Sequence, residues 1–269
     1  MKGLQTIDRA VQVLEVIGAA STIGARMIDV MRATGLGRAT SHRFLKAMLD
    51  QQLVEHDTDT GRYFLGLKLL MLSNAASNRF GLARHAAPAL RRLAERTGDT
   101  VYLSVRVGDL AFCLDRVEGA FPIRTLTLKI GDCRPLGVGA GSMALLAFLP
   151  IEEVRRLVTA SAAAIAVFGL DEANLLSIAQ TARRLGYAFN DGRIIPGMGA
   201  VGVPVCGKAR IPIAALSVAA ITSRMSPSRR NSIVSWLKEE AATLETELGA
   251  VLDHVAGPSR ATLLGKAAA

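Results

Sequence analysis

The chain has 269 residues, half of them apolar, and a net charge of +9. This length fits one large domain or two ordinary ones, and the apolar content is sufficient for a core. No apolar run reaches the roughly 18 residues of a membrane span, and the N-terminal MKGLQTIDRA lacks a signal-peptide core, so we expect a cytoplasmic protein with no membrane partner. The three cysteines, Cys113, Cys133 and Cys206, are odd in number and widely spaced, which argues against a disulfide framework or zinc site and predicts reduced thiols.

Positive charge is concentrated near the N-terminus. Residues 26–46 contain one acidic side chain, Asp29, against five basic ones, which are Arg26, Arg32, Arg38, Arg43 and Lys46. A basic surface favours an acidic partner such as nucleic acid. The alternative is an ordinary solvated helix face, which is what most charge runs form.

The same region predicts a helix-turn-helix. Residues 5–19 repeat apolar side chains at helical spacing, and residues 21–24 interrupt the pattern. A short helix over residues 25–33 and a second helix from Arg38 flank the sequence TGL at 34–36, where glycine permits the positive φ of a tight turn. On the second helix we expect four side chains to face the core: Ser41, Phe44, Leu45 and Met48.

Two short extended runs, LVEH and RYFL, follow around the polar turn DTDTG at residues 57–61. Such a hairpin directly after a helix-turn-helix predicts the wing of a winged helix. A helix is expected next, over residues 67–80, with Leu67, Leu70, Met71 and Asn74 on one face. This face is either a dimer contact or a plain packing surface.

The second predicted helix is suited to the DNA major groove, where base edges present a readable pattern of donors and acceptors. Arginine pairs with guanine, threonine contacts phosphate or a thymine methyl, and a helix N-terminus favours phosphate. The predicted DNA-binding residues are Arg38, Thr40, His42, Arg43 and Lys46 on this helix and Arg62 in the wing.

From residue 82 onward the pattern mixes strands and helices, which predicts an α+β domain. An amphipathic helix at 82–98 precedes alternating strands that turn at Gly108-Asp109. Further strands are expected at 122–130, 200–206 and 210–221. Further helices are expected at 142–149, 151–159, 171–185 and 227–248. The motifs GxxxxGK(S/T), HExxH and GxSxG are absent, so we expect no enzyme, no catalytic residues, no metal and no cofactor.

Several segments together resemble the isocitrate lyase regulator (IclR) family of bacterial transcription factors. They include LQTIDRAVQVLEVIG, ATGLGRATSHRFLKAML, LVEHDTDTGRYFLGLKLL, APALRRLAERTGDTVYLSV and RRLGYAFNDGRIIPGMGAVGVPV, and the resemblance covers residues 4 to about 250 in the family's order. It implies an α+β protein with a winged helix-turn-helix at 1–66, a linker helix at 67–81 and a GAF-like effector-binding domain at 82–255. It also implies a homodimer or homotetramer that binds a palindromic operator on double-stranded DNA and controls metabolic genes. The small and polar composition of residues 256–269 predicts a disordered tail.

The resemblance places an effector pocket under the loop RPLGVGAGSMA, residues 134–144. Its turn at Ala140 and Gly141 opens a helix, and such a turn is also an anion site on physical grounds. The residues predicted to bind the effector are Ile123, Leu126, Arg134, Ala140, Gly141, Asn190, Met198, Ala200, Ser217 and Ala219.

The chain departs from the family at several pocket positions. Gly137 and Met143 stand where a histidine and a lysine are frequent, Arg134 stands where leucine is common, and the run from Asn190 to Arg193 replaces a more acidic one. The hypothesis is an organic-acid effector with Arg134 as its counter-charge, whereas the alternative is an Arg134 that extends to water. Two other functions stay open: a DNA-binding regulator whose pocket has lost its ligand, and a small-molecule enzyme.

Overall fold

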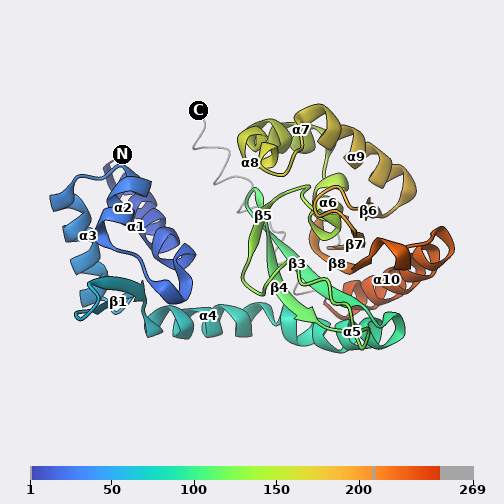
Figure 1. Ribbon diagram of the computed structural model, residues 1–269, viewed down its shortest axis with the longest axis horizontal. Helices are drawn as coiled ribbons and strands as arrows, with labels where there is room; N and C mark the ends of the chain where they lie inside the picture. The colour runs from blue at the N-terminus through green and yellow to red at the C-terminus, as the bar shows by residue number, and fades with distance from the viewer. Residues whose placement is uncertain (1, 208–209, 249–269) are drawn as a thin grey trace. The chain divides into compact units, whose positions relative to one another are not determined.

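The computed structural model describes residues 2–207 and 210–248 of the chain (Figure 1). The polypeptide divides into two compact units, Met1–Arg79 and Phe80–Ala269. The predicted tail at 256–269 lies outside the described residues.

The first unit is a winged helix. Helices α1 (Lys2–Ala19), α2 (Met27–Thr34) and α3 (Arg38–Asp50) precede the antiparallel strands β1 (Val54–Asp57) and β2 (Arg62–Leu65). Gly35 ends α2 in the left-handed conformation, with φ +67°, and its N–H donates to the Met31 carbonyl at 2.9 Å. The predicted helix-turn-helix and hairpin are both present. Glycine at position 35 permits the turn between α2 and α3.

One small core holds this unit together. Buried side chains from the three helices and β1 meet there, namely Val13, Ile17, Val30, Leu45, Met48 and Val54. Ser41, Leu45 and Met48 on α3 are buried and Phe44 is partly buried, which confirms the predicted inner face of that helix. Burial of each large aliphatic side chain stabilises the unit by about 1.5–3 kcal/mol.

Helix α4 (Leu67–Phe80) follows β2 and carries large apolar side chains that are exposed within the described chain. Leu67, Leu70, Met71 and Leu72 each expose more than half of their surface. Exposed apolar side chains of this number on one helix are unusual for a helix that packs only within its own chain.

The second unit is built on a six-stranded sheet with the order β5-β4-β3-β8-β7-β6, in which every neighbouring pair is antiparallel. The strands are β3 (Thr100–Val107), β4 (Leu110–Val117), β5 (Cys133–Pro135), β6 (Ala188–Asn190), β7 (Met198–Cys206) and β8 (Pro212–Ile221). The helices are α5 (Leu82–Thr97), α6 (Ala140–Ala147), α7 (Ile151–Ala160), α8 (Ala162–Ala166), α9 (Glu172–Leu185) and α10 (Pro227–Glu247). The predicted α+β class is confirmed.

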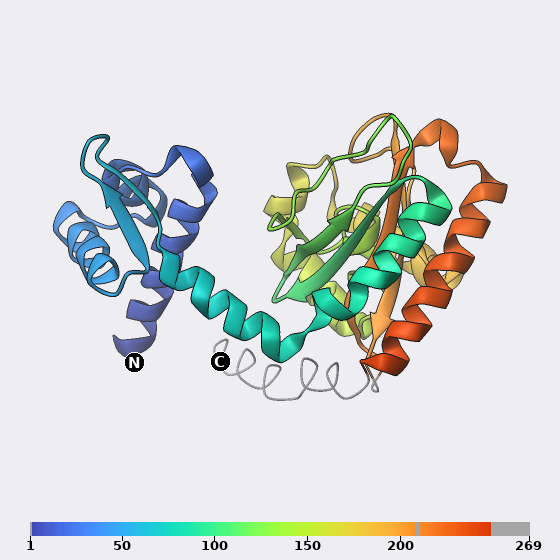
Figure 2. The same cartoon turned by 90° about the horizontal axis from the view of Figure 1, so that it is seen from below.

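Helices cover both faces of this sheet. Helices α5 and α10 lie side by side on one face, where Leu90, Leu93 and Leu237 pack against alternate residues of β3, β7 and β8 (Figure 2). Helices α6, α7 and α9 cover the other face and form a second core with Leu145, Leu157 and other aliphatic side chains. Strand alternation separates the two faces, so β3 sends Val101 and Leu103 into the first core and Tyr102 and Ser104 to the opposite side.

The predicted strand at 122–130 is wrong. Residues 121–130 form an irregular segment without strand pairing, and the short strand β5 takes the place beside β4 instead. Side-chain donors from Tyr102, Arg116 and Arg134 bond to the carbonyls of this segment in place of a backbone ladder. The short elements β5, β6 and α8 were not predicted from the sequence, since each spans only three to five residues.

Candidate functional site

The first candidate site is the outer face of α3. Arg38, His42, Arg43 and Lys46 are exposed and Thr40 is partly buried, whereas Leu45 and Met48 of the same helix are buried. Because the apolar stripe fixes the helix in the core, the basic face is held toward solvent without any change of fold.

The N-terminus of α3 adds to this basic face. Gly37 precedes the helix and no side chain caps it, so the first-turn N–H groups are open to an external acceptor. Positive side chains and free N–H groups at one helix end suit contacts with phosphate and with base edges.

Arg62, which was predicted to contact DNA from the wing, bonds within its own unit in this structure. Its Nη1 donates to the carbonyls of Ile23 and Gly24, at 3.2 and 2.8 Å. The guanidinium therefore joins the wing to the segment before α2. The wing turn is also closed internally, because Asp57 accepts from the Thr60 hydroxyl at 2.7 Å, and this bond and two backbone N–H donors lower the pKa of Asp57.

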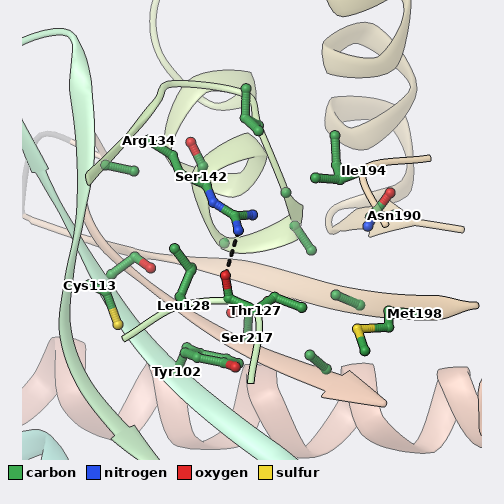
Figure 3. Close-up of a pocket in the computed structure, with 18 of the residues that line it drawn as sticks. Tyr102, Cys113, Thr127, Leu128, Arg134, Ser142, Asn190, Ile194, Met198 and Ser217 are labelled. Atoms are coloured by element: carbon green, nitrogen blue, oxygen red, sulfur yellow. Dashed lines mark hydrogen bonds between the residues drawn. The ribbon is translucent and has the colours of Figure 1, made fainter. Parts of the chain in front are cut away.

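The second candidate site is a pocket in the α+β unit, between the sheet, the N-terminus of α6 and the segment that precedes β5 (Figure 3). Tyr102 and Ser104 of β3 and Ser217 and Ala219 of β8 form its floor. The space that the centre of a water molecule can occupy is about 50 Å³, a few times what one buried water needs. The pocket as it stands suits a small molecule.

Two glycines let α6 approach the floor closely. A β-carbon on Gly202 would lie 2.5 Å from the Ala140 carbonyl oxygen, and one on Gly141 would lie 2.9 Å from the Ser217 hydroxyl. Gly139 precedes the helix with φ +92°, a conformation that other residues rarely adopt. The first N–H groups of α6 are consequently held at the pocket, where they suit an acceptor such as a carboxylate.

The pocket floor carries the hydroxyls of Ser104 and Ser217. Ser104 and Ser217 are 4% and 6% exposed, and neither hydroxyl has a hydrogen-bond partner within the part of the chain that the structure describes. Ser142 differs, because its hydroxyl accepts from the Gly137 N–H and donates to the Pro135 carbonyl, both at 2.9 Å. Both serines line the pocket, and a hydroxyl can donate and accept, so the two side chains suit a polar ligand.

Arg134 is the charged group of the pocket. Its Nη2 donates to the Thr127 carbonyl at 2.6 Å, and no carboxylate among the described residues lies within ion-pair distance of it. Burial lowers its pKa, and an arginine remains protonated under such shifts. A partly buried guanidinium with one hydrogen bond and no counter-ion suits an anionic ligand.

The pocket thiol is not a nucleophile. Cys113 lies in the wall, and burial raises its pKa to about 11, so it is protonated near neutral pH. Burial also raises the pKa of Cys206, to about 11. Cys113 and Cys206 are buried, as expected for core thiols, whereas Cys133 is exposed.

Most of the predicted pocket residues come together in the structure. The ones that line the pocket are Arg134, Ala140, Gly141, Asn190, Met198, Ala200, Ser217 and Ala219. Ile123 and Leu126 do not, since they are 55% and 48% exposed and lie outside the lining. Thr127 and Leu128 occupy the wall that these two were expected to supply, because the irregular segment turns those residues inward.

Other pocket residues had no prediction from the sequence. The alternation of β3 with Val101 and Leu103 would have placed Tyr102 and Ser104 together on the opposite face. Thr127, Leu128 and Ile194 lie on irregular segments, for which the sequence offers no periodic signal.

Within the described ranges, no group of three or more His, Cys, Asp or Glu side chains is placed to hold a metal ion. The helices of residues 2–207 and 210–248 include none with the length and apolar character to cross a membrane.

A winged helix with a basic recognition helix, joined in one chain to an α+β unit with a small polar pocket, defines a class of DNA-binding transcription regulators. The family model described as "Bacterial transcriptional regulator IclR C-terminal" matches residues 74–246, and "IclR helix-turn-helix domain" matches residues 6–58. The chain belongs to the IclR family, as its sequence motifs predicted.

The chain is similar to curated transcriptional regulators over most of their length. The HTH-type transcriptional regulator XynR of Escherichia coli is 26% identical, covering 91% of this chain and 98% of that protein. The HTH-type transcriptional regulator BhcR of Paracoccus denitrificans is 29% identical, covering 90% of this chain and 86% of that protein. These names agree with the expectation of a regulator rather than an enzyme.

Solved structures share the fold. A putative IclR transcriptional regulator from Silicibacter sp. TM1040 gives a TM-score of 0.80 at 24% identity, covering 91% of this chain and 96% of that chain. An IclR homologue from Microbacterium hydrocarbonoxydans, crystallised with 4-hydroxybenzoate, gives a TM-score of 0.73 at 25% identity, covering 91% of this chain and 99% of that chain.

Proposed function

We propose that the protein is a ligand-responsive transcription regulator that binds a palindromic operator as a homodimer or homotetramer. Residues 1–66 bind the DNA, residues 67–81 form the linker and residues 82–255 bind a small organic-acid effector. The regulated genes belong to a metabolic operon, with organic-acid or aromatic catabolism as the expected pathway. A regulator of this kind works only if the effector binds one arrangement of the DNA-binding units better than another.

The DNA-binding part of the proposal is supported by the exposed face of α3. We assign Arg43 and Thr40 to base or phosphate contacts in the major groove, with Arg38, His42 and Lys46 flanking them. Arg62 supports the wing through its bonds to Ile23 and Gly24 and therefore contributes less to direct contacts.

The single observation that carries the effector proposal is that Arg134 has no carboxylate partner among the residues that the structure describes, in the same pocket as the hydroxyls of Ser104 and Ser217. A carboxylate would pair with the guanidinium and with the N–H groups of α6, and an added hydroxyl or carbonyl would bond to the serines. The homologue crystallised with 4-hydroxybenzoate binds a carboxylate of the expected chemistry.

Dimer formation is supported by the exposed apolar side chains of α4, which a second copy of the helix would cover. A dimer of winged helices presents two recognition helices, and their two-fold symmetry matches a palindromic operator.

Selection of bound fragments from the source genome with the purified protein, read at two salt concentrations, tests the DNA part. One enriched short palindrome that is lost steeply at higher salt would support the proposal, and its neighbouring genes would indicate the pathway. Sequence-blind retention would instead mean that the basic face of α3 binds phosphates only.

A screen of small carboxylates against the protein bound to that operator tests the effector part. The proposal expects at least one acid that changes both the operator affinity and the melting temperature. If none changes either property, the alternative of a regulator without a ligand would replace it.

A further inference from the structure

Residues 118–132 connect β4 to β5, a pair of antiparallel neighbours that a short hairpin could have joined. Connections this long without secondary structure are uncommon in compact units and usually have a function. We call residues 121–130 the strap; two of its residues, Thr127 and Leu128, form part of the pocket wall.

The ends of the strap are fixed by the backbone. The Phe121 N–H donates to the Gly98 carbonyl at 2.8 Å, and the Gly131 N–H donates to the Cys113 carbonyl at 2.9 Å. Thr125 is buried and donates its hydroxyl to the Ala219 carbonyl at 2.7 Å.

The middle of the strap depends on side chains. Tyr102 donates to the Thr125 carbonyl, Arg134 to the Thr127 carbonyl at 2.6 Å, and Arg116 to the Leu128 carbonyl at 2.9 Å. Strand pairing would hold a segment through many backbone bonds, whereas here two arginines join Thr127 and Leu128 to the pocket wall. Lys129 is held in a turn, since its N–H donates to the Asp132 carboxylate at 2.7 Å and its carbonyl accepts from the Asp132 N–H at 3.1 Å. Removal of one donor should therefore change the equilibrium between a closed and an open strap.

Arg134 lies where it can bond to the strap and to a ligand at the same time. A β-carbon on Gly139, at the turn before α6, would lie 3.7 Å from Arg134 Nη1, while Nη2 bonds to the strap. The guanidinium thus lies between the N-terminus of α6 and the Thr127 carbonyl (Figure 3). An arginine has five N–H donors, and the bond to Thr127 uses one of them, so the others can donate to an anion at the helix end.

We propose that Arg134 holds the strap closed over the pocket and that an anion bound at the N-terminus of α6 strengthens this closure through the same guanidinium. An anion that fixes the guanidinium reduces the freedom that Arg134 must lose to bond to Thr127, so occupancy and closure favour each other. This inference rests on the proposed effector site and adds a conformational response to it.

Limited proteolysis of the full-length protein with trypsin tests the proposal, because Lys129 is an exposed cleavage site inside the strap. Without added ligand, Arg134→Met is expected to raise the rate of cleavage after Lys129 about tenfold, measured against cleavage after the exposed Arg26 of the other unit in the same sample. Arg134→Lys should give a smaller increase, since a lysine can reach one acceptor but lacks the planar set of donors. Arg106→Met on β3 is the control, because Arg106 pairs with Glu153 and not with the strap.

The second arm adds sodium acetate or 4-hydroxybenzoate, each compared with its neutral amide. The carboxylates, but not the amides, should slow cleavage after Lys129 in the wild type and have no effect in Arg134→Met. Unchanged cleavage in Arg134→Met would overturn the role of Arg134 in closure, and a wild type insensitive to both carboxylates would overturn the coupling. If both arms succeed but no acid alters operator affinity, the strap mechanism stands and the proposed regulatory function fails.

Discussion

Gly141 of α6 and Ser217 of β8 are in such close contact that a β-carbon on the glycine would lie 2.9 Å from the serine hydroxyl oxygen. Because the oxygen belongs to a short side chain in the floor of the sheet, it has little freedom to retreat. The contact fixes the distance between the N-terminus of α6 and the pocket floor.

The first prediction concerns this contact. Gly141→Val should abolish the effector response and leave operator binding within about twofold of wild type, because the added atoms fill the anion site in a unit that does not contain α3. Overpacking of this kind costs about 1–3 kcal/mol of folding stability. Operator binding by gel shift and effector binding by calorimetry measure the two effects.

Ser217→Ala provides a matched test of the same contact. Gly141→Ala should weaken effector binding in the wild-type background and weaken it less in the Ser217→Ala background, since the oxygen that meets the new methyl is then absent. If Gly141→Val loses operator binding as well, the α6 turn supports the fold rather than the ligand.

The second prediction concerns base recognition. Arg43→Ala should weaken operator binding by about 1–3 kcal/mol and relax the base preference at one position of each half-site. Binding curves on the operator and on random DNA give the comparison. Arg156→Ala in α7 removes the same charge from the other unit and should leave both curves unchanged. An equal loss on both DNAs would show that Arg43 contacts phosphate only.

The third prediction separates Arg62 from the DNA contacts. Arg62→Ala removes the donor to the Ile23 and Gly24 carbonyls and should destabilise the winged helix by about 1 kcal/mol. Urea unfolding followed by circular dichroism measures this loss. The salt dependence of operator binding should keep its slope, whereas the loss of a phosphate contact would reduce it by about 0.9.

The fourth prediction concerns alkaline stability. Burial raises the pKa of Cys113 and of Cys206 from 9.0 to about 11, so the folded state retains protons that the unfolded state releases between these values. The stabilisation is complete below pH 9 and is lost as the pH rises to about 11, at about 3 kcal/mol for each thiol. Urea unfolding at several pH values should show a smaller decline for a Cys113→Ala/Cys206→Ala variant than for the wild type. If the free energy of unfolding fell equally with pH in the two proteins, the raised pKa of the two thiols would be contradicted.

The amino-acid sequence by itself determined the local elements of this protein. Helical periodicity, the glycine at position 35 and the polar turn before Arg62 specify the winged helix, because each acts through neighbours a few residues away. The same holds for the amphipathic helix α5 and for the alternating strands β3 and β4. The family motifs likewise placed Ala140, Gly141 and Ser217 in one pocket before their distances were known.

Only the tertiary structure decided which side chains meet. The strap has no strand pairing, and it turns Thr127 rather than Leu126 toward the pocket. Side-chain donors on β3, β4 and β5 hold it in this position, and periodicity within the strap does not predict them. The bonds of Arg62 to the carbonyls before α2 likewise could not be predicted, since those acceptors lie about forty residues earlier in the chain. Periodicity reports which face of an element is apolar, but the partner of a polar side chain depends on segments that folding brings together.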